Sequence, residues 1–241
     1  SLIFADPDAQ RKRVIGVRFT RNGSSRQIRV HRAALLSAGA FQSPQILELS
    51  GIGQATRLRG LGIRMMADLR GVGENLADHY ISRLSWRLRE DISINKTAHG
   101  FRLLREILRF GLARRGSLSM PAGMLAGFVR SRDGLVGPDI QYHIANASFA
   151  NPAKRVFDKF PGMTFGPCQL RPESRGTVHI TSADAFAAPI IRPNYLASAE
   201  DRRVHVAGMR IARDIMQSKI MAPFVDHEMK PGADIVSHDE M

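Results

Sequence analysis

The chain has 241 residues, 44% of them hydrophobic and 24% charged, which is ordinary for a globular protein of one large domain or two small ones. No stretch approaches the roughly 20 apolar residues of a membrane span, so no transmembrane segment is expected. The formal net charge of +13 invites a nucleic-acid ligand, but the arginines are scattered and no basic stripe or nucleic-acid-binding motif is present. We therefore predict no nucleic-acid partner.

The first predicted element is a β-hairpin near the N-terminus. Apolar patterning indicates one strand over residues 14–19 and a second, longer strand over residues 27–36. Between them, Asn22 and Gly23 form the strongest short signal for a tight hairpin turn, since both residue types accept positive φ. The run over residues 33–40 is apolar on both faces, which predicts a segment buried in a larger sheet.

Two helices are expected next, the first beginning at Ser43 and ending at Gly51. Serine is a favoured N-cap, Pro44 suits the first helical position, and glycine accepts the left-handed conformation at a helix end. A second, short helix is predicted over residues 54–61. A loop with two glycines follows over residues 65–79.

The rest of the chain alternates in a way that favours strands with two further helices. Strands are predicted over residues 81–88, 125–130, 139–145, 163–170 and 177–181. Apolar residues at helical spacing predict an amphipathic helix over residues 101–112. A last helix is expected after Ser198, with Asp201 completing a capping box. Its predicted buried stripe consists of Val204, Ala207, Gly208, Ile211 and Ile215.

Local patterns alone do not define an active site. No complete dinucleotide glycine motif, P-loop, zinc cluster or nucleophile elbow occurs, so no metal site is predicted. His79, beside Asp78 in the glycine-bearing loop, is the best functional candidate, and a packed or capping histidine is the alternative. His143 follows Tyr142 on an alternating strand, where it either binds a ligand or faces solvent.

Three blocks resemble those of the glucose-methanol-choline oxidoreductases. Residues 39–53 read Gly-Ala-Phe-Gln-Ser-Pro-Gln-Ile-Leu-Glu-Leu-Ser-Gly-Ile-Gly and match the second signature of that family at every specified position. Residues 72–79, Val-Gly-Glu-Asn-Leu-Ala-Asp-His, resemble its Val-Gly-x-Asn-Leu-x-Asp-His segment. Residues 170–178 and 193–196 resemble its C-terminal section. The nearest resemblance is to choline-dehydrogenase-like members.

This resemblance implies an α+β (mixed α/β) fold with two domains. Residues 1–80 would form part of an FAD-binding domain, and residues 81–241 a substrate-binding domain built on an antiparallel sheet with helices packed on one side. The implied reaction oxidises a small alcohol to an aldehyde by hydride transfer to FAD. The residues implied to lie near the flavin are Gly39, Ala40, Asn75, Asp78 and His79.

Two motifs of the family do not occur in the chain. The dinucleotide motif is expected upstream of Ser1, and the catalytic histidine, in a His-Pro-x-Gly-Thr context, beyond Met241. No catalytic residue is therefore assigned, and the chain alone is expected to be inactive and to bind FAD weakly or not at all. Met124 stands where choline-type members carry a glutamate facing the substrate cation, which puts choline in doubt. Substrate-lining candidates are Met124, Tyr142 and His143.

The sequence leaves open another function, the oligomeric state and the cellular compartment. A stand-alone binding module that has lost flavin chemistry would explain the same motifs, and it predicts a natural start and stop near the two ends. The apolar run over residues 33–40 lacks sheet neighbours in this chain, so a homodimer or an exposed apolar patch is expected there. The single cysteine, Cys168, fits a reducing compartment, and we expect a cytoplasmic protein or one peripheral to the inner membrane in its parent.

Overall fold

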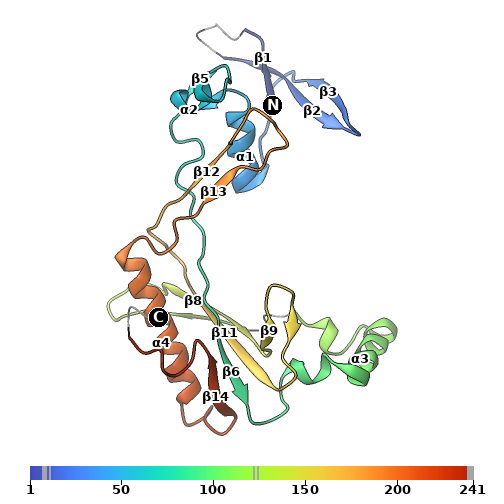
Figure 1. Cartoon of the computed structure of the whole chain (residues 1–241), viewed down its shortest axis with the longest axis vertical. Coiled ribbons are helices and arrows are strands. Elements are labelled where there is room, and N and C mark those ends of the chain that lie inside the picture. The colour runs from blue at the N-terminus through green and yellow to red at the C-terminus, as the bar shows by residue number, and fades with distance from the viewer. Residues whose placement is uncertain (7–9, 11, 122, 124, 238–241) are drawn as a thin grey trace. The chain divides into compact units, whose positions relative to one another are not determined.

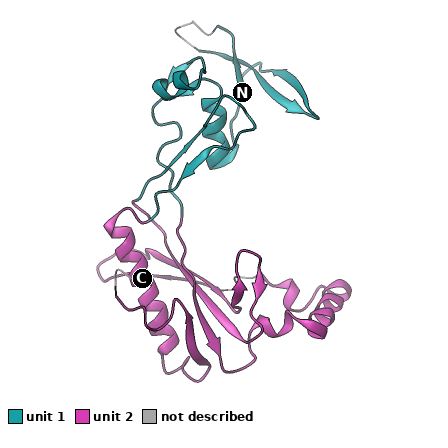
Figure 2. Ribbon diagram, in the orientation of Figure 1, with its two compact units in different colours: residues 1–78, 174–195 teal, residues 79–173, 196–241 magenta. Residues whose placement is uncertain are grey.

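The computed structural model describes residues 1–241 except for residues 7–9, 11, 122, 124 and 238–241 (Figure 1). The chain divides into two compact units (Figure 2). Unit 1 holds Ser1–Asp78 together with Ser174–Tyr195, and unit 2 holds His79–Glu173 and the chain from Leu196 onward. The return of residues from the C-terminal third to unit 1 is a feature that local sequence patterns did not indicate.

The described residues of unit 1 form a small antiparallel sheet, two helices and two short strand pairs. Its elements are β1 (Leu2–Phe4), β2 (Val14–Arg21), β3 (Ser24–Arg29), α1 (Gly39–Glu48), β4 (Ile52–Gly53), α2 (Ala55–Gly60), β5 (Ala67–Asp68), β12 (Thr177–His179) and β13 (Ile190–Arg192). The predicted hairpin is confirmed, because β2 and β3 pair across Asn22 and Gly23, whose φ angles are 52° and 74°. The predicted short second helix corresponds to α2.

The buried strand expected over residues 33–40 is wrong. β3 ends at Arg29, residues 33–38 have no regular secondary structure, and α1 already begins at Gly39. Leu35 is 94% exposed. None of the described strands pairs with this run, so its backbone has no ladder to join. The homodimer expected to cover an apolar patch here stays a prediction.

The first helix begins earlier than the sequence indicated, at Gly39 rather than at Ser43. The Ser43 hydroxyl accepts the N–H of Ala38, the residue that precedes the helix, at 3.2 Å. Pro44 consequently lies inside the helix and not at its first position. The helix ends at Glu48, slightly before the predicted end, and Gly51 follows with the predicted left-handed φ of 81°.

Unit 2 is built on an antiparallel sheet whose described strands run in the order β14-β6-β11-β8-β7. Its elements are β6 (Leu84–Leu88), the 3-10 helix η1 (Ile94–Thr97), α3 (Gly100–Ala113), the 3-10 helix η2 (Ser117–Ser119), β7 (Leu125–Val129), β8 (Ile140–Ala145), β9 (Phe149–Asn151), β10 (Val156–Phe157), β11 (Gly162–Gln169), α4 (Ala199–Gln217) and β14 (Val225–Lys230). α4 packs against β11 and β8 (Figure 1). The predicted α+β fold with an antiparallel sheet is confirmed.

The sheet face toward α4 carries the core of unit 2. Trp86 and Phe165 meet edge to face with ring centroids 5.6 Å apart, and Tyr142 meets Phe165 in the same way at 5.9 Å. The Tyr142 hydroxyl donates to the Gly208 carbonyl of α4 at 2.6 Å. A Cβ on Gly208 would lie 2.9 Å from Cβ of Pro167, so glycine allows this close helix-to-sheet approach.

α4 starts where the sequence indicated, and the Ser198 hydroxyl accepts the N–H of Glu200. Its buried stripe is rotated from the predicted one, because Val204 and Gly208 are buried but Ile215 is 38% exposed. The buried residues are Asp201, Val204, His205, Val206, Gly208, Met209, Ala212, Arg213 and Met216. Arg213 is tolerated in this stripe because it forms a buried ion pair with Glu228 of β14, with N–O distances of 2.9 Å.

Candidate functional site

Two glutamates and a histidine join three segments of unit 1. Glu48, in α1, is fully buried, and its Oε1 lies 2.8 Å from Nδ1 of His179 in β12. The other oxygen of the same carboxylate accepts the N–H of Ile180 at 2.8 Å. Nε2 of His179 lies 3.0 Å from Oε1 of Glu74. A buried carboxylate without such partners is strongly unfavourable, so this cluster ties α1, β12 and the loop around Glu74 together.

The loop over residues 71–77 is held in an unusual backbone conformation. The Gly73 carbonyl accepts the N–H of Val178 at 2.7 Å, and a Cβ on Gly73 (φ 81°) would lie 2.4 Å from the Val178 carbonyl oxygen. Leu76 exchanges two backbone hydrogen bonds of 2.8 and 2.9 Å with Gly176. Asn75 has a φ of 60°, in the left-handed region that asparagine accepts better than most residues. β12 and its preceding residue therefore fix the shape of this loop.

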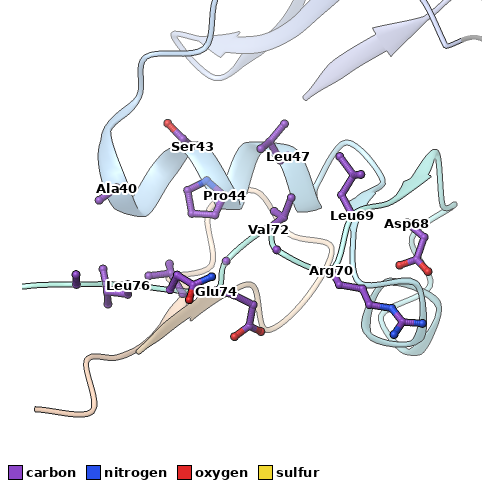
Figure 3. Close-up of a pocket in the computed structure, with 15 residues that line it drawn as sticks. Ala40, Ser43, Pro44, Leu47, Asp68, Leu69, Arg70, Val72, Glu74 and Leu76 are labelled. Carbon is purple, nitrogen blue, oxygen red and sulfur yellow. The ribbon is translucent and has the colours of Figure 1, made fainter. Parts of the chain in front are cut away.

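α1 and the 71–77 loop border a cavity of about 860 Å³ within unit 1 (Figure 3). It is lined by Ala40, Ser43, Pro44, Leu47, Asp68, Leu69, Arg70, Gly71, Val72, Gly73, Glu74, Asn75, Leu76, Ala77 and Val178. Most of these side chains are apolar or small. Two of the residues singled out from the sequence, Ala40 and Asn75, meet at this cavity.

Gly39, Asp78 and His79 are not among the described residues that line it. The Asp78 carboxylate accepts the Tyr195 hydroxyl, and this hydrogen bond raises the pKa of Tyr195. His79 belongs to unit 2, where its Nε2 lies 3.3 Å from the Leu170 carbonyl oxygen. Gly39 opens α1 with a φ of 84°.

A second cavity, of about 700 Å³, lies within unit 2 on the sheet face opposite α4. It is lined by Ile81, Arg83, Gly123, His143, Ala145, Phe149, Pro152, Arg155, Phe157, Thr164 and Gly166. His143 lines it because strand alternation turns His143 away from the core side of β8. Tyr142, its neighbour, lies on that core side, and Met124 lies outside the described residues.

Glu48, Glu74 and His179 were not among the predicted site residues. Glu48 carried a signal, since it is an acid between apolar neighbours in a helix, and His179 carried another between Val178 and Ile180. Glu48 and His179 are 131 residues apart in the sequence, however, and no local pattern indicates that they meet.

The described part of the chain offers neither a membrane span nor a metal site. No helix in it is long and apolar enough to cross a membrane. It also holds no group of three or more His, Cys, Asp and Glu side chains placed to bind a metal ion.

Solved structures share this fold. A formate oxidase from Aspergillus oryzae RIB40 superposes with a TM-score of 0.85 at 24% identity, covering 99% of this chain and 46% of that one. A fungal aryl-alcohol oxidase superposes with a TM-score of 0.77 at 21% identity, covering 98% of this chain and 46% of that one. The chain thus has the fold of these two oxidases.

Matches to family models and to relatives show the family of the chain. GMC oxidoreductase models match residues 2–81 and 172–241, together more than half of the chain. The chain therefore belongs to the glucose-methanol-choline oxidoreductase family, as its motif blocks predicted. Oxygen-dependent choline dehydrogenases of Chromohalobacter salexigens and Photobacterium profundum are 34% and 35% identical to it, each over 95% of this chain. The chain spans 41% and 40% of the length of these relatives.

Proposed function

We propose that this chain supplies part of the flavin domain and most of the substrate domain of an FAD-dependent enzyme that oxidises a small alcohol to an aldehyde. Unit 1 is the flavin-binding part, and the sheet face of unit 2 opposite α4 is the substrate wall. One observation carries the proposal. The cavity of unit 1 is bordered by α1 and the 71–77 loop, and these are the two segments that bear the first two family motifs.

The residues of this cavity suit part of a dinucleotide cofactor. Its volume of about 860 Å³ lies within the range of roughly 300–1,000 Å³ common for ligand sites. Ser43 and Asn75 add hydrogen-bonding groups to a largely apolar wall. No side chain caps α1, so the N–H groups of its first turn suit a phosphate oxygen, and Ala40 of that turn lines the cavity.

When bound, FAD would accept the hydride that leaves the alcohol carbon. The residues of the chain bind and orient the cofactor. Ala40 leaves room at the wall, Asn75 carries its amide on a left-handed backbone, and the cluster of Glu48, Glu74 and His179 holds the loop in place. We assign no residue of this chain as the base for the alcohol proton, so we expect the isolated chain to be inactive and to bind FAD weakly or not at all.

The flavin assignment is tested on the complete protein that contains this chain, with two matched variants. Ala40→Phe places a ring in the cavity and should lower the FAD content about tenfold or more, since overpacking a site costs about 1–3 kcal/mol. Ala185→Phe adds the same ring at an exposed position of unit 1 outside the lining, and it should keep its FAD. FAD content is read from the visible absorbance of flavin per protein.

The reaction is tested by mixing the complete protein with small primary alcohols without oxygen. The flavin absorbance should bleach and the aldehyde should appear in equal amount. Full FAD content in Ala40→Phe would place the cofactor elsewhere. A complete protein that folds but purifies without FAD, and takes none up, would refute the proposed function.

A further inference from the structure

The cavity of unit 2 is basic. Arg83, ahead of β6, and Arg155, in the turn between β9 and β10, line it from separate segments of the chain. His143 of β8 adds a third basic side chain. No Asp or Glu occurs among the described residues of this lining.

Arg83 and Arg155 differ in their contacts from Arg87 of β6. Arg87, four residues after Arg83, lies 3.9 Å from the Asp226 carboxylate and over the ring of Phe160. Within the described residues, neither Arg83 nor Arg155 has a side-chain hydrogen bond or an ion-pair partner. Two such cations beside one cavity leave a positive field there that no carboxylate of the wall compensates.

The remaining wall is apolar and aromatic. Phe149 and Phe157 stack with ring centroids 4.9 Å apart and an interplanar angle of 26°, and Ile81 and Ala145 complete the surface. Aromatic faces attract a trimethylammonium group. The guanidiniums act against this attraction, because like charges repel more strongly where walls exclude water. Charge therefore decides which substrates the cavity favours.

We propose that the alcohol oxidised at this site carries an anionic oxygen-rich group, such as a carboxylate, which Arg83 and Arg155 bind. The inference rests on the proposed function, since it names the substrate class of the same site. A guanidinium presents paired N–H donors that match two oxygens of a carboxylate or sulfonate. The choline in the names of the relatives carries the opposite charge, so the substrate class differs from theirs.

The test compares three alcohols of similar shape on the complete, FAD-loaded protein. Choline carries a cation two carbons from the hydroxyl, 3,3-dimethylbutan-1-ol is its neutral analogue, and 2-hydroxyethanesulfonate carries an anion at the same place. The expected order of kcat/KM is anion, then neutral alcohol, then cation, with about tenfold or more between anion and cation. Added salt should reduce the difference in kcat/KM between the anion and the cation.

Variants assign the effect to the two arginines. Arg83→Gln and Arg155→Gln should each raise KM for the sulfonate about tenfold and leave KM for the neutral alcohol within about twofold. Arg83→Lys keeps the charge but not the paired donors, and it should recover only part of the loss. Arg87→Gln is the matched control, because Arg87 points to the same sheet face, does not line the cavity, and should leave all three alcohols unchanged.

A binding measurement separates this inference from the proposed function. Calorimetric titration with 1-propanesulfonate, which has no hydroxyl to oxidise, should show binding that weakens about tenfold in Arg83→Gln. If no alcohol bleaches the flavin, the proposed function fails and the titration still decides the charge preference. Equal binding by both proteins, or preference for choline over the sulfonate, would overturn the inference while leaving alcohol oxidation intact.

Discussion

α3 and α4 are both amphipathic helices of unit 2, and both are expected from apolar spacing, yet they are buried to opposite extents. α4 presents nine buried residues to its surroundings. In α3 the one buried residue is Glu106, while Phe101 and Leu112 are 82% and 88% exposed. Helical periodicity thus identifies which face is apolar but not what covers it, above all in a chain that spans less than half the length of its relatives.

The two helices are also anchored by different chemistry. α4 is held by apolar packing on the sheet, whereas α3 is held at Glu106, whose Oε2 accepts the N–H and the hydroxyl of Ser117 at 2.7 and 3.0 Å. Gly116, with a φ of 100°, allows this approach, because a Cβ there would lie 2.4 Å from the same oxygen. The hydrogen bonds from Ser117 lower the pKa of Glu106.

The largest change in the free energy of unfolding is expected for substitutions on the buried side of α4. Met209→Ala opens a cavity in the core and should lower the free energy of unfolding of unit 2 by about 2–5 kcal/mol. Ile215→Ala, on the exposed side of the same helix, should cost about 1 kcal/mol or less. Urea unfolding followed by fluorescence of Trp86, the one tryptophan of the chain, measures both. Equal losses of unfolding free energy in the two variants would mean that the buried face of α4 does not hold it on the sheet.

A second expected change in stability depends on pH. Burial lowers the pKa of His205 in α4 from its usual value of 6.5, and Nε2 has no hydrogen-bond partner among the described residues. The unfolded chain therefore takes up this proton at a higher pH than the folded chain does. Stability is full above about pH 6.5 and falls as the pH drops towards the lowered value, by at most about 1.4 kcal/mol per pH unit.

His205→Phe should flatten this pH dependence in the same urea experiment. His227→Gln, at an exposed histidine of β14, is the control substitution. A wild-type curve that is level between pH 7 and pH 5 would contradict the assignment.

A smaller, local effect is expected in α3. Glu106→Ala removes the acceptor for Ser117 and should speed amide hydrogen exchange over residues 100–119 without moving the unfolding transition that Trp86 reports. Glu106→Gln keeps an acceptor oxygen and should exchange more slowly than the alanine variant. Because the pKa of Glu106 is lowered, wild-type protection should persist above its usual value of 4.5 and fade as the pH falls below it.

The smallest effect is expected on the exposed face of α3. Leu108, which is 55% exposed, should tolerate Leu108→Ser with a change of about 0.5 kcal/mol or less. Val204→Ser, in the buried stripe of α4, is the comparison and should cost several times more. A large loss for Leu108→Ser would show that something covers this face in solution, and dependence of the loss on protein concentration would identify a second copy.

Local signals predicted the parts of the fold that depend on few residues. The turn at Asn22 and Gly23, the cap at Ser198 and the alternation along β8 need only neighbours in the sequence. The run over residues 33–40 was misjudged because burial depends on strands elsewhere. The short β9–β10 hairpin, which carries Arg155, was missed because strands of two or three residues hold too little pattern.

Some residues of the candidate sites could likewise be predicted from the sequence, and others could not. Ala40 and Asn75 were singled out through family motifs, and they line one cavity. Glu48 and His179 were not, because their contact depends on a strand that returns from the far end of the chain. Arg83 was overlooked since a single exposed arginine on a strand resembles ordinary surface until the opposite wall of its cavity is known.

The return of residues 174–195 to unit 1 has a consequence for synthesis on the ribosome. Residues 1–78 emerge before β12 and β13 do, so at that stage the Glu48 carboxylate has no imidazole to meet. The strands of unit 2 from β6 to β11 are made in between. Unit 1 therefore closes late, after much of unit 2 has left the ribosome, and a nascent chain halted at residue 173 would expose the side of α1 that His179 later covers.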